Sequence, residues 1–256
     1  MKRGIRSAAN ISAAVLGSLY MAYRRLRPFR SADLASKLLN LGCGVTVAPG
    51  WVNVDHSEHI LVARIPGMAV LLHRFGFLDA QQLEWYQTGI FGNVLYWDIR
   101  KKMPFPTAHF EWVYCSHLLE HLYPATARTL LIEIYRLLSL RGRVRIVVPD
   151  LRLAIHEYIR GRELCMIGDE QVQAFGKTLR VDQLANELSR YFHSPEPVED
   201  RLFGHRWMYD SWSLREMLKQ CGFQQVMESG FRQGDCPDVA ILDSYPSTSL
   251  YVEAVR

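Results

Sequence analysis

One short stretch, CSHLLEHL at residues 115–122, contains residue types that bind metals: His117, Glu120 and His121 form an H-x-x-E-H string. On a helix, histidines four residues apart share one face and can bind zinc, with the glutamate as general base. Glu187 is the obvious third ligand downstream. Pro124, however, leaves room for only about two helical turns around the pair, and so short a pattern arises easily by chance. We predict no metal here, and a zinc hydrolase using HLLEH is a remote alternative.

A glycine turn and two acids form a second set of candidate residues. Gly42 and Gly44, in LNLGCG, allow a sharp turn and let a ligand approach the backbone without a Cβ in the way. Asp55 and Asp98 each close a short apolar run. A dinucleotide fingerprint would need a further glycine where Val47 stands, and only ten residues separate Gly44 from Asp55. This spacing disfavours a pyrophosphate cofactor.

A nucleoside without phosphates would use the same groups. The Asp55 carboxylate can accept charge-assisted hydrogen bonds from both ribose hydroxyls. Asp98 can accept a hydrogen bond from an adenine amino group, and the backbone amide of Ile99 can donate to the ring. Each acid alone is equally well explained as a strand-end turn or a helix cap. Together, and in this order, they indicate an adenosine site.

The elements that must position these residues follow an alternating pattern. We expect strands at 37–41, 51–55, 93–98, 109–116 and 143–150, with a mainly helical stretch over 60–92 broken at Pro66, Gly76 and Gly89. A helix is expected at 124–142 with Gly142 as its stop, then a capped helix at 210–223 and strands at 224–230 and 249–256. This order predicts an α/β doubly wound sheet, whose ligands bind beyond the carboxyl ends of the strands.

Four segments, taken together, resemble a known family: LLNLGCG, WVNVD, YWDIRKKMPFPTAHFEWVYCSHLLEHL and EIYRLLSLRGRVRIVVPDL. They look like class I S-adenosylmethionine-dependent methyltransferases, in particular the type-11 methyltransferase domain. The resemblance is specific over residues 38–151 and weaker over 205–255. It implies a Rossmann-like sheet of seven strands with an antiparallel last strand, and S-adenosyl-L-methionine as the cofactor. Related methyltransferases often show S-x-x-L-E-H-L here, so the resemblance also accounts for the H-x-x-E-H string.

The resemblance implies a set of cofactor-binding positions. In chain order these are Asn40, Gly42, Cys43, Gly44, Asp55, Asp98, Ile99, Cys115 and Ser116. The glycine turn would face the methionine part of the cofactor, the first acid the ribose and the second the adenine. The last two positions would line the floor near the sulfonium. Asn40 stands where the family commonly has an acid.

Two candidate bases and one aromatic segment bear on the methyl acceptor. His117 and Asp150 are the best placed to take a proton from an acceptor hydroxyl, although a structural role is as good an explanation for each. His205, Arg206 and Tyr209 lie in GHRWMYD, where an arginine beside aromatic rings could bind an anionic group and stack on a ring. The alternative is a packed loop that leads into the capped helix at Ser211 or Ser213.

The acceptor class is inferred by analogy. Relatives of this branch are often associated with surface-polysaccharide biosynthesis, which favours a small-molecule or saccharide acceptor and O-methylation. Residues 151–210, an irregular stretch rich in charges and aromatics, are expected to form a helical lid or substrate wall. A catalytically silent protein that binds the cofactor as a scaffold is the alternative from another functional class.

Charge and cysteine content indicate where the chain works. Five cysteines with no C-x-x-C pair favour a reducing, cytoplasmic compartment. Residues 1–30 carry seven basic residues and no acid, which leaves 23 basic against 26 acidic residues in the remainder, so we expect no nucleic-acid partner. The apolar run at 8–23 is shorter than the roughly 18–20 residues of a bilayer span. Residues 1–35 are therefore predicted as a helical leader to a domain at 36–256. It either packs on that domain or lies on the anionic inner face of a membrane.

Overall fold

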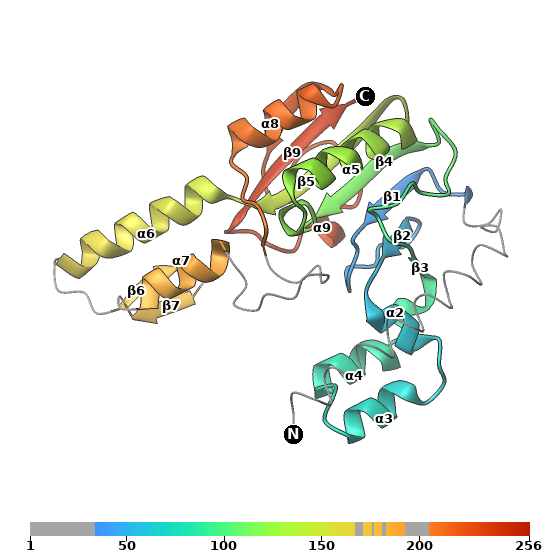
Figure 1. Cartoon of the computed structure of the whole chain (residues 1–256), viewed down its shortest axis with the longest axis horizontal. Coiled ribbons are helices and arrows are strands. Elements are labelled where there is room, and N and C mark those ends of the chain that lie inside the picture. The colour runs from blue at the N-terminus through green and yellow to red at the C-terminus, as the bar shows by residue number, and fades with distance from the viewer. Residues whose placement is uncertain (1–33, 167–170, 176, 181–182, 193–204) are drawn as a thin grey trace. The chain divides into compact units, whose positions relative to one another are not determined.

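The computed structural model describes residues 34–166, 171–175, 177–180, 183–192 and 205–256 (Figure 1). Apart from residues 34 and 35, the predicted leader at 1–35 lies outside the described residues. None of the helices in the described part combines the length and the apolar character that a membrane span needs. By its internal contacts the chain divides after Pro106 into two compact units, a boundary that the sequence does not predict.

Within the described residues, seven strands form one mixed sheet in the order β3-β2-β1-β4-β5-β9-β8. The strands are β1 (Leu38–Leu41), β2 (Val52–Asp55), β3 (Val94–Tyr96), β4 (Phe110–Ser116), β5 (Leu138–Pro149), β8 (Gln224–Ser229) and β9 (Ser249–Val255). β1, β2 and β3 pair in parallel, as do β4 and β5, whereas β9 runs antiparallel to both of its neighbours. The predicted Rossmann-like, doubly wound fold with an antiparallel last strand is confirmed.

The first unit, up to Pro106, holds β1, β2 and β3 and a run of short helices. These are α2 (Glu58–Ala63), α3 (Met68–Arg74), α4 (Ala80–Gln87) and the 3-10 helix η2 (Ile90–Asn93). The prediction of a broken helical stretch is confirmed, because Gly67 caps α3 and Gly89 caps η2, both with positive φ. Asp79 and Gln82 form a capping box at the start of α4. Buried apolar side chains from α2, η2 and β3 form the core of this unit.

The second unit, from Thr107 on, is built around β4, β5, β9 and β8. Its helix α5 (Pro124–Leu137) buries an apolar stripe that includes Leu130, Leu131, Ile134 and Leu137. From Val144 to Pro149, β5 is buried without interruption, as expected for a strand with neighbours on both sides. Helix α8 (Ser211–Gln220) begins at a capping box of Asp210 and Ser213, one residue before the earlier of the two predicted caps. α9 (Val239–Leu242) precedes the last strand.

The predicted helix at 124–142 is too long. α5 ends at Leu137, and the chain enters β5 with a shifted register between Phe110 and Trp112 of β4. A Cβ at Gly142 would lie 2.9 Å from the carbonyl oxygen of Ser139 and 3.0 Å from that of Phe110. Gly142 is therefore needed where backbones approach closely, and the sequence alone makes it look like a helix stop.

The insertion between β5 and α8 is more regular than its composition suggests. It contains α6 (Leu151–Met166), an antiparallel hairpin of β6 (Gln171–Ala174) and β7 (Lys177–Arg180), and α7 (Leu184–Phe192). Figure 1 shows α6, α7 and the hairpin side by side, and Val172, Ala174, Leu179 and Leu184 form a small core between them. The insertion is thus a packed subdomain. Its use as a lid stays a prediction.

Candidate active site

The glycine turn after β1 has the backbone that its sequence predicts. Gly42 and Gly44 both have positive φ, at 66° and 51°. The Gly42 amide donates a 2.8 Å hydrogen bond to the carbonyl oxygen of Val54, which fastens the turn to β2. A Cβ built at Gly44 would meet no atom within 4 Å, so open space lies beside this backbone. A ligand could approach the turn closely at this point.

The buried side chain of Asn40 stabilises this turn through hydrogen bonds. Its side chain is 1% exposed, and Nδ2 donates to Oδ1 of Asn53 and to the carbonyl oxygen of Thr46, each at 2.9 Å. Asn53 in turn donates to the carbonyl oxygens of Ala48 and Trp51. Both amide hydrogens of Asn40 are therefore used within the chain, a role that the sequence does not predict. A side-chain contact of Asn40 with a cofactor would therefore have to use Oδ1, as an acceptor.

Asp55 links the end of β2 to the glycine turn. One carboxylate oxygen accepts a 2.8 Å hydrogen bond from the Gly44 amide, and the other a 2.6 Å bond from the Ser57 amide. Each carboxylate oxygen can accept twice, and the side chain is only half-buried. Acceptor positions therefore remain for the hydroxyls of a sugar.

Asp98 follows β3 and pairs with a neighbour that the sequence does not single out. Nε of Arg100 lies 2.9 Å from Oδ1, and Nη2 lies 3.1 Å from Oδ2. Burial alone would raise the pKa of Asp98, but the hydrogen bonds from Arg100 outweigh it, so the pKa is lowered. Asp98 is thus a buried, ionised carboxylate whose partner is more than a third exposed.

His56 follows Asp55 at the end of β2 and packs against the neighbouring strand β3. Its ring stacks on Tyr96 with centroids 4.9 Å apart. Burial lowers the pKa of His56, while the charges of Asp98 and Asp55 both oppose that change. Because Trp97 also donates to the carbonyl oxygen of Asp55, the ends of β2 and β3 lie side by side. The two predicted carboxylates thus stand at the ends of adjacent parallel strands.

Two further predicted cofactor contacts differ in what they can offer. The Ile99 amide donates to no acceptor in the part of the chain that the structure describes, so it remains available to an adenine ring. The Cys43 side chain packs in the core with Ile60 and Leu61, and burial followed by the Asp55 charge raises the pKa of its thiol. Cys43 therefore has only its backbone to offer a ligand.

In the second unit, β4 ends with Cys115 and Ser116. The Cys115 side chain is fully buried, and burial raises the pKa of its thiol. Ser116 is half-buried. His117 follows with a φ of 49°, and its amide donates to the carbonyl oxygen of Val147 on β5. The strand end therefore holds the backbone of His117 firmly.

Both ring nitrogens of His117 lie close to oxygen atoms of other side chains. Nδ1 lies 3.2 Å from Oε1 of Glu120, and Nε2 lies 2.9 Å from Oγ of Ser249 at the start of β9. The ring also packs against Tyr245 with centroids 4.1 Å apart. A carboxylate, an imidazole and a hydroxyl thus stand in a row, and the imidazole side chain is 21% exposed.

The H-x-x-E-H string does not form the predicted helical face. Leu119–His121 is a single 3-10 turn, η3, and the positive φ at His117 precedes it. His117 and His121 are therefore not related by one α-helical turn. The suggested third zinc ligand, Glu187, pairs instead with Lys177 at 3.0 Å. The helical geometry of the zinc site that the string spells is therefore not formed, and the absence of a metal there stays a prediction.

The predicted acceptor-binding segment is fastened to the same turn. The amides of Arg206 and Trp207 both donate to the carbonyl oxygen of Glu120, at 2.7 and 3.1 Å. The His205 ring lies 5.4 Å from that of His121, and the Arg206 guanidinium lies over Tyr123 at 4.8 Å. This backbone connection was not predictable from either segment alone.

Tyr209 and Asp150 have more structural surroundings than the sequence predicts. Tyr209 is 0% exposed, so it lies inside the unit, and reaching a substrate would require it to move. The Asp150 carboxylate accepts hydrogen bonds from the amides of Arg152 and Leu153, which makes it a cap of α6. Catalytic and substrate-binding roles for these two residues stay predictions.

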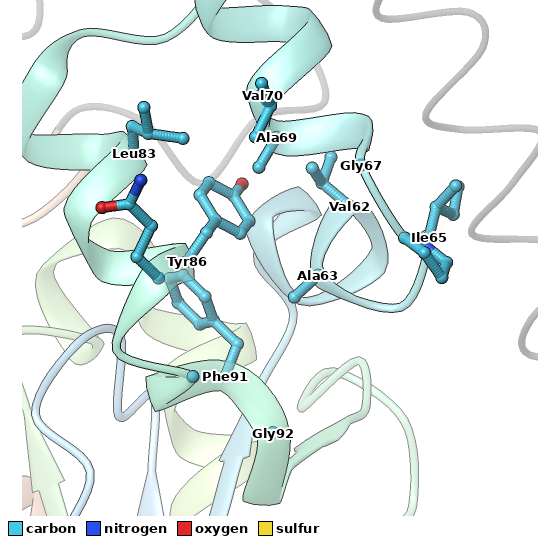
Figure 2. Close-up of a pocket in the computed structure, with 13 residues that line it drawn as sticks. Val62, Ala63, Ile65, Gly67, Ala69, Val70, Leu83, Tyr86, Phe91 and Gly92 are labelled. Atoms are coloured by element: carbon cyan, nitrogen blue, oxygen red, sulfur yellow. The ribbon is translucent and has the colours of Figure 1, made fainter.

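A cavity of about 250 Å³ lies elsewhere in the first unit (Figure 2). Its walls come from α2, α3, α4 and η2 and include Val62, Val70, Leu83, Tyr86 and Phe91. None of the residues predicted for a cofactor, acceptor or base lines it. The chemistry of the glycine turn and the acids is therefore separate from this apolar hollow.

Residues 78–146 match the methyltransferase domain family. The match confirms the resemblance read from the sequence, and the predicted cofactor with it. It spans α4 to β5, so Asp98, Cys115, Ser116 and His117 lie inside it, and the glycine turn and Asp55 lie before it. Among curated proteins, no sequence matches the chain.

Solved methyltransferase structures resemble the chain distantly. A SAM-dependent methyltransferase from Archaeoglobus fulgidus is 14% identical with a TM-score of 0.43, and covers 94% of each chain. One from Mesorhizobium loti is 16% identical with a TM-score of 0.40, and covers 93% of this chain and 97% of its own. One from Aquifex aeolicus is 12% identical with a TM-score of 0.40, over 88% and 86%. At these scores the likenesses carry no argument about what the chain binds.

Proposed function

We propose that the chain is an S-adenosylmethionine-dependent methyltransferase that methylates a hydroxyl of a small-molecule or saccharide acceptor. The observation that carries the proposal is the placement of Asp55 and Asp98 at the ends of the adjacent parallel strands β2 and β3, with open space beside Gly44. A nucleoside needs acceptors for two ribose hydroxyls and for an adenine amino group, and these two carboxylates supply them.

The residues fit this ligand group by group. Gly44 offers backbone without a Cβ, Asp55 keeps acceptor positions free, and Ile99 has an amide hydrogen to donate. Arg100 now holds both oxygens of Asp98, and its side chain is 39% exposed. Binding an adenine amino group would require Arg100 to share one of these oxygens, which an exposed side chain can do at low cost.

The bound cofactor would supply a sulfonium methyl group that is already activated for transfer. The chain would supply the base. An acceptor hydroxyl that takes the position of the Ser249 hydroxyl could pass its proton to Nε2 of His117. Glu120, 3.2 Å from Nδ1, would then stabilise the imidazolium. Asp150, which caps α6, is the less suitable base.

The test is a methyl-transfer assay with labelled S-adenosylmethionine and a panel of hydroxyl, carboxyl and amino acceptors that includes monosaccharides and nucleotide sugars. We expect transfer to a hydroxyl, and loss of about 100-fold or more in kcat for His117→Ala, the range for a general base. His73→Ala, on α3 of the first unit, is the matched control and should keep full activity. Cofactor binding without transfer to any acceptor would favour the scaffold alternative and contradict the proposal.

A further inference from the structure

Glu120 is a buried carboxylate whose charge is not fully compensated. It is 0% exposed, and neither carboxylate oxygen has a hydrogen-bond partner in the described part of the chain. Two imidazoles lie beside it, with His117 Nδ1 at 3.2 Å and His121 Nε2 at 4.0 Å from Oε1. Burying a carboxylate without hydrogen bonds or a firm ion pair is energetically unfavourable. A cationic group beside Glu120 would remove that cost.

A third imidazole lies at the same place from far along the chain. The ligand atoms of Glu120, His121 and His205 all lie within 4.8 Å of one another. The position of His205 is fixed by the two hydrogen bonds from the next two amides to the carbonyl oxygen of Glu120. The rings of His121 and His205 are inclined at 63°, with centroids 5.4 Å apart. Both histidines are partly exposed, so the cluster is accessible from solvent.

We propose that Glu120, His121 and His205 bind a divalent first-row transition cation, with Zn²⁺ as the first ion to test. Two imidazole nitrogens and one carboxylate oxygen are a ligand set that such cations favour. Metal–ligand bonds of about 2.0–2.2 Å would need the donor atoms to draw closer, through small rotations of the two partly exposed rings. Three protein ligands would leave a position open for water or another oxygen ligand.

Neighbouring groups are suited to support the ligands. His117 lies against the carboxylate through Nδ1 and is itself held by Ser249, so it can orient Glu120. Tyr209 is buried, and its hydroxyl has no hydrogen-bond partner among the described residues.

This site differs from the one that the H-x-x-E-H string spells. There the two ligands would be His117 and His121 on one helical face, whereas here His205 replaces His117. It also departs from our sequence-based prediction of no metal. The site goes beyond the proposed methyl transfer and does not depend on it, because metal binding can be measured with no cofactor present.

The experiment is calorimetric titration of Zn²⁺ into the intact chain after chelator treatment, with the absorption spectrum of added Co²⁺ as a second readout. We expect one Zn²⁺ per chain and an affinity at least about tenfold weaker in His205→Ala and in Glu120→Gln. His156→Ala is the matched control, because His156 is an exposed histidine on α6, and it should bind as the wild type does.

Circular dichroism of each variant separates a lost ligand from a lost fold, and His205→Ala, at a partly exposed position, keeps the test valid if Glu120→Gln does not fold. A folded wild-type chain that binds no Zn²⁺, or a His205→Ala variant that binds it as tightly as the wild type, would overturn the proposal. Either result would leave the methyltransferase proposal standing, because that proposal depends on cofactor binding and methyl transfer.

Discussion

Asp55 serves the backbone and the proposed ligand at once. Its two oxygens hold the amides of Gly44 and Ser57, so the carboxylate shapes the turn that it would share with the cofactor. The residue types at this site were predictable because each stands at the end of its own strand. Their neighbours His56 and Arg100 were not predictable, because the sequence does not show which acid each of them will interact with.

At this scale we predict that Asp55→Asn weakens binding of S-adenosylhomocysteine. The neutral amide removes the charge from the hydrogen bonds to ribose, and its NH₂ group would face one of the two donating backbone amides. A loss of about 1.5–3 kcal/mol, or about tenfold to a hundredfold in affinity, follows from the strength of charged hydrogen bonds. Calorimetry measures it. Asp79→Asn, an exposed helix cap in the same unit, should bind normally. Equal affinity in a folded Asp55→Asn variant would refute the role of this carboxylate.

Between elements, Arg145 is the main polar connection of the second unit. It is a fully buried residue of β5 that lies 2.6 Å from Oδ2 of Asp243 and 2.8 Å from Oε1 of Glu253. It therefore links β5 to β9 and to the segment after α9. The sequence correctly predicts a buried strand here, but the two carboxylates follow about a hundred residues later, so sequence patterns do not predict the pairing.

We expect Arg145→Ala to destabilise the chain by about 3–5 kcal/mol, because it leaves two buried carboxylates without their cation. Urea unfolding followed by circular dichroism measures the change. Arg143→Ala is the matched control two residues away. Its ion pair with Asp235 is largely exposed, so its loss should cost at most about 1 kcal/mol. If the two variants lost similar amounts of unfolding free energy, the buried ion pairs of Arg145 would not be the stabilising contacts that we infer.

The elements were predictable where their signals are local. Apolar runs in the sequence correctly predicted the strands. Gly67 and Gly89 cap helices at or next to the predicted breaks. The predicted end of α5 was wrong. Gly142 lies within β5, where a Cβ would come too close to the carbonyl oxygen of Phe110 on the neighbouring strand β4. Gly142 looks like a helix stop from its neighbours in sequence, but it is a glycine because the backbone of β4 comes too close for a side chain.

At the scale of the whole molecule, each unit carries one part of the proposed chemistry. The first contains the glycine turn and both acids, and the second contains His117, Glu120, His121 and His205. The order of strands predicted the first set well, because parallel strands end at one edge of a sheet. In the second set, the closeness of His117, Glu120 and His121 follows from the sequence. That of His205 does not, because hydrogen bonds between distant segments bring it to Glu120.

Titration of S-adenosylhomocysteine into the intact chain, with NAD as the matched comparison, is the most direct test of the phosphate-free adenosine site. We predict saturable binding of S-adenosylhomocysteine at one site and no binding of NAD, because the glycine turn lacks the third glycine and the following helix that a pyrophosphate needs. A folded chain that does not bind S-adenosylhomocysteine, or that binds NAD at least as tightly as S-adenosylhomocysteine, would contradict the assignment.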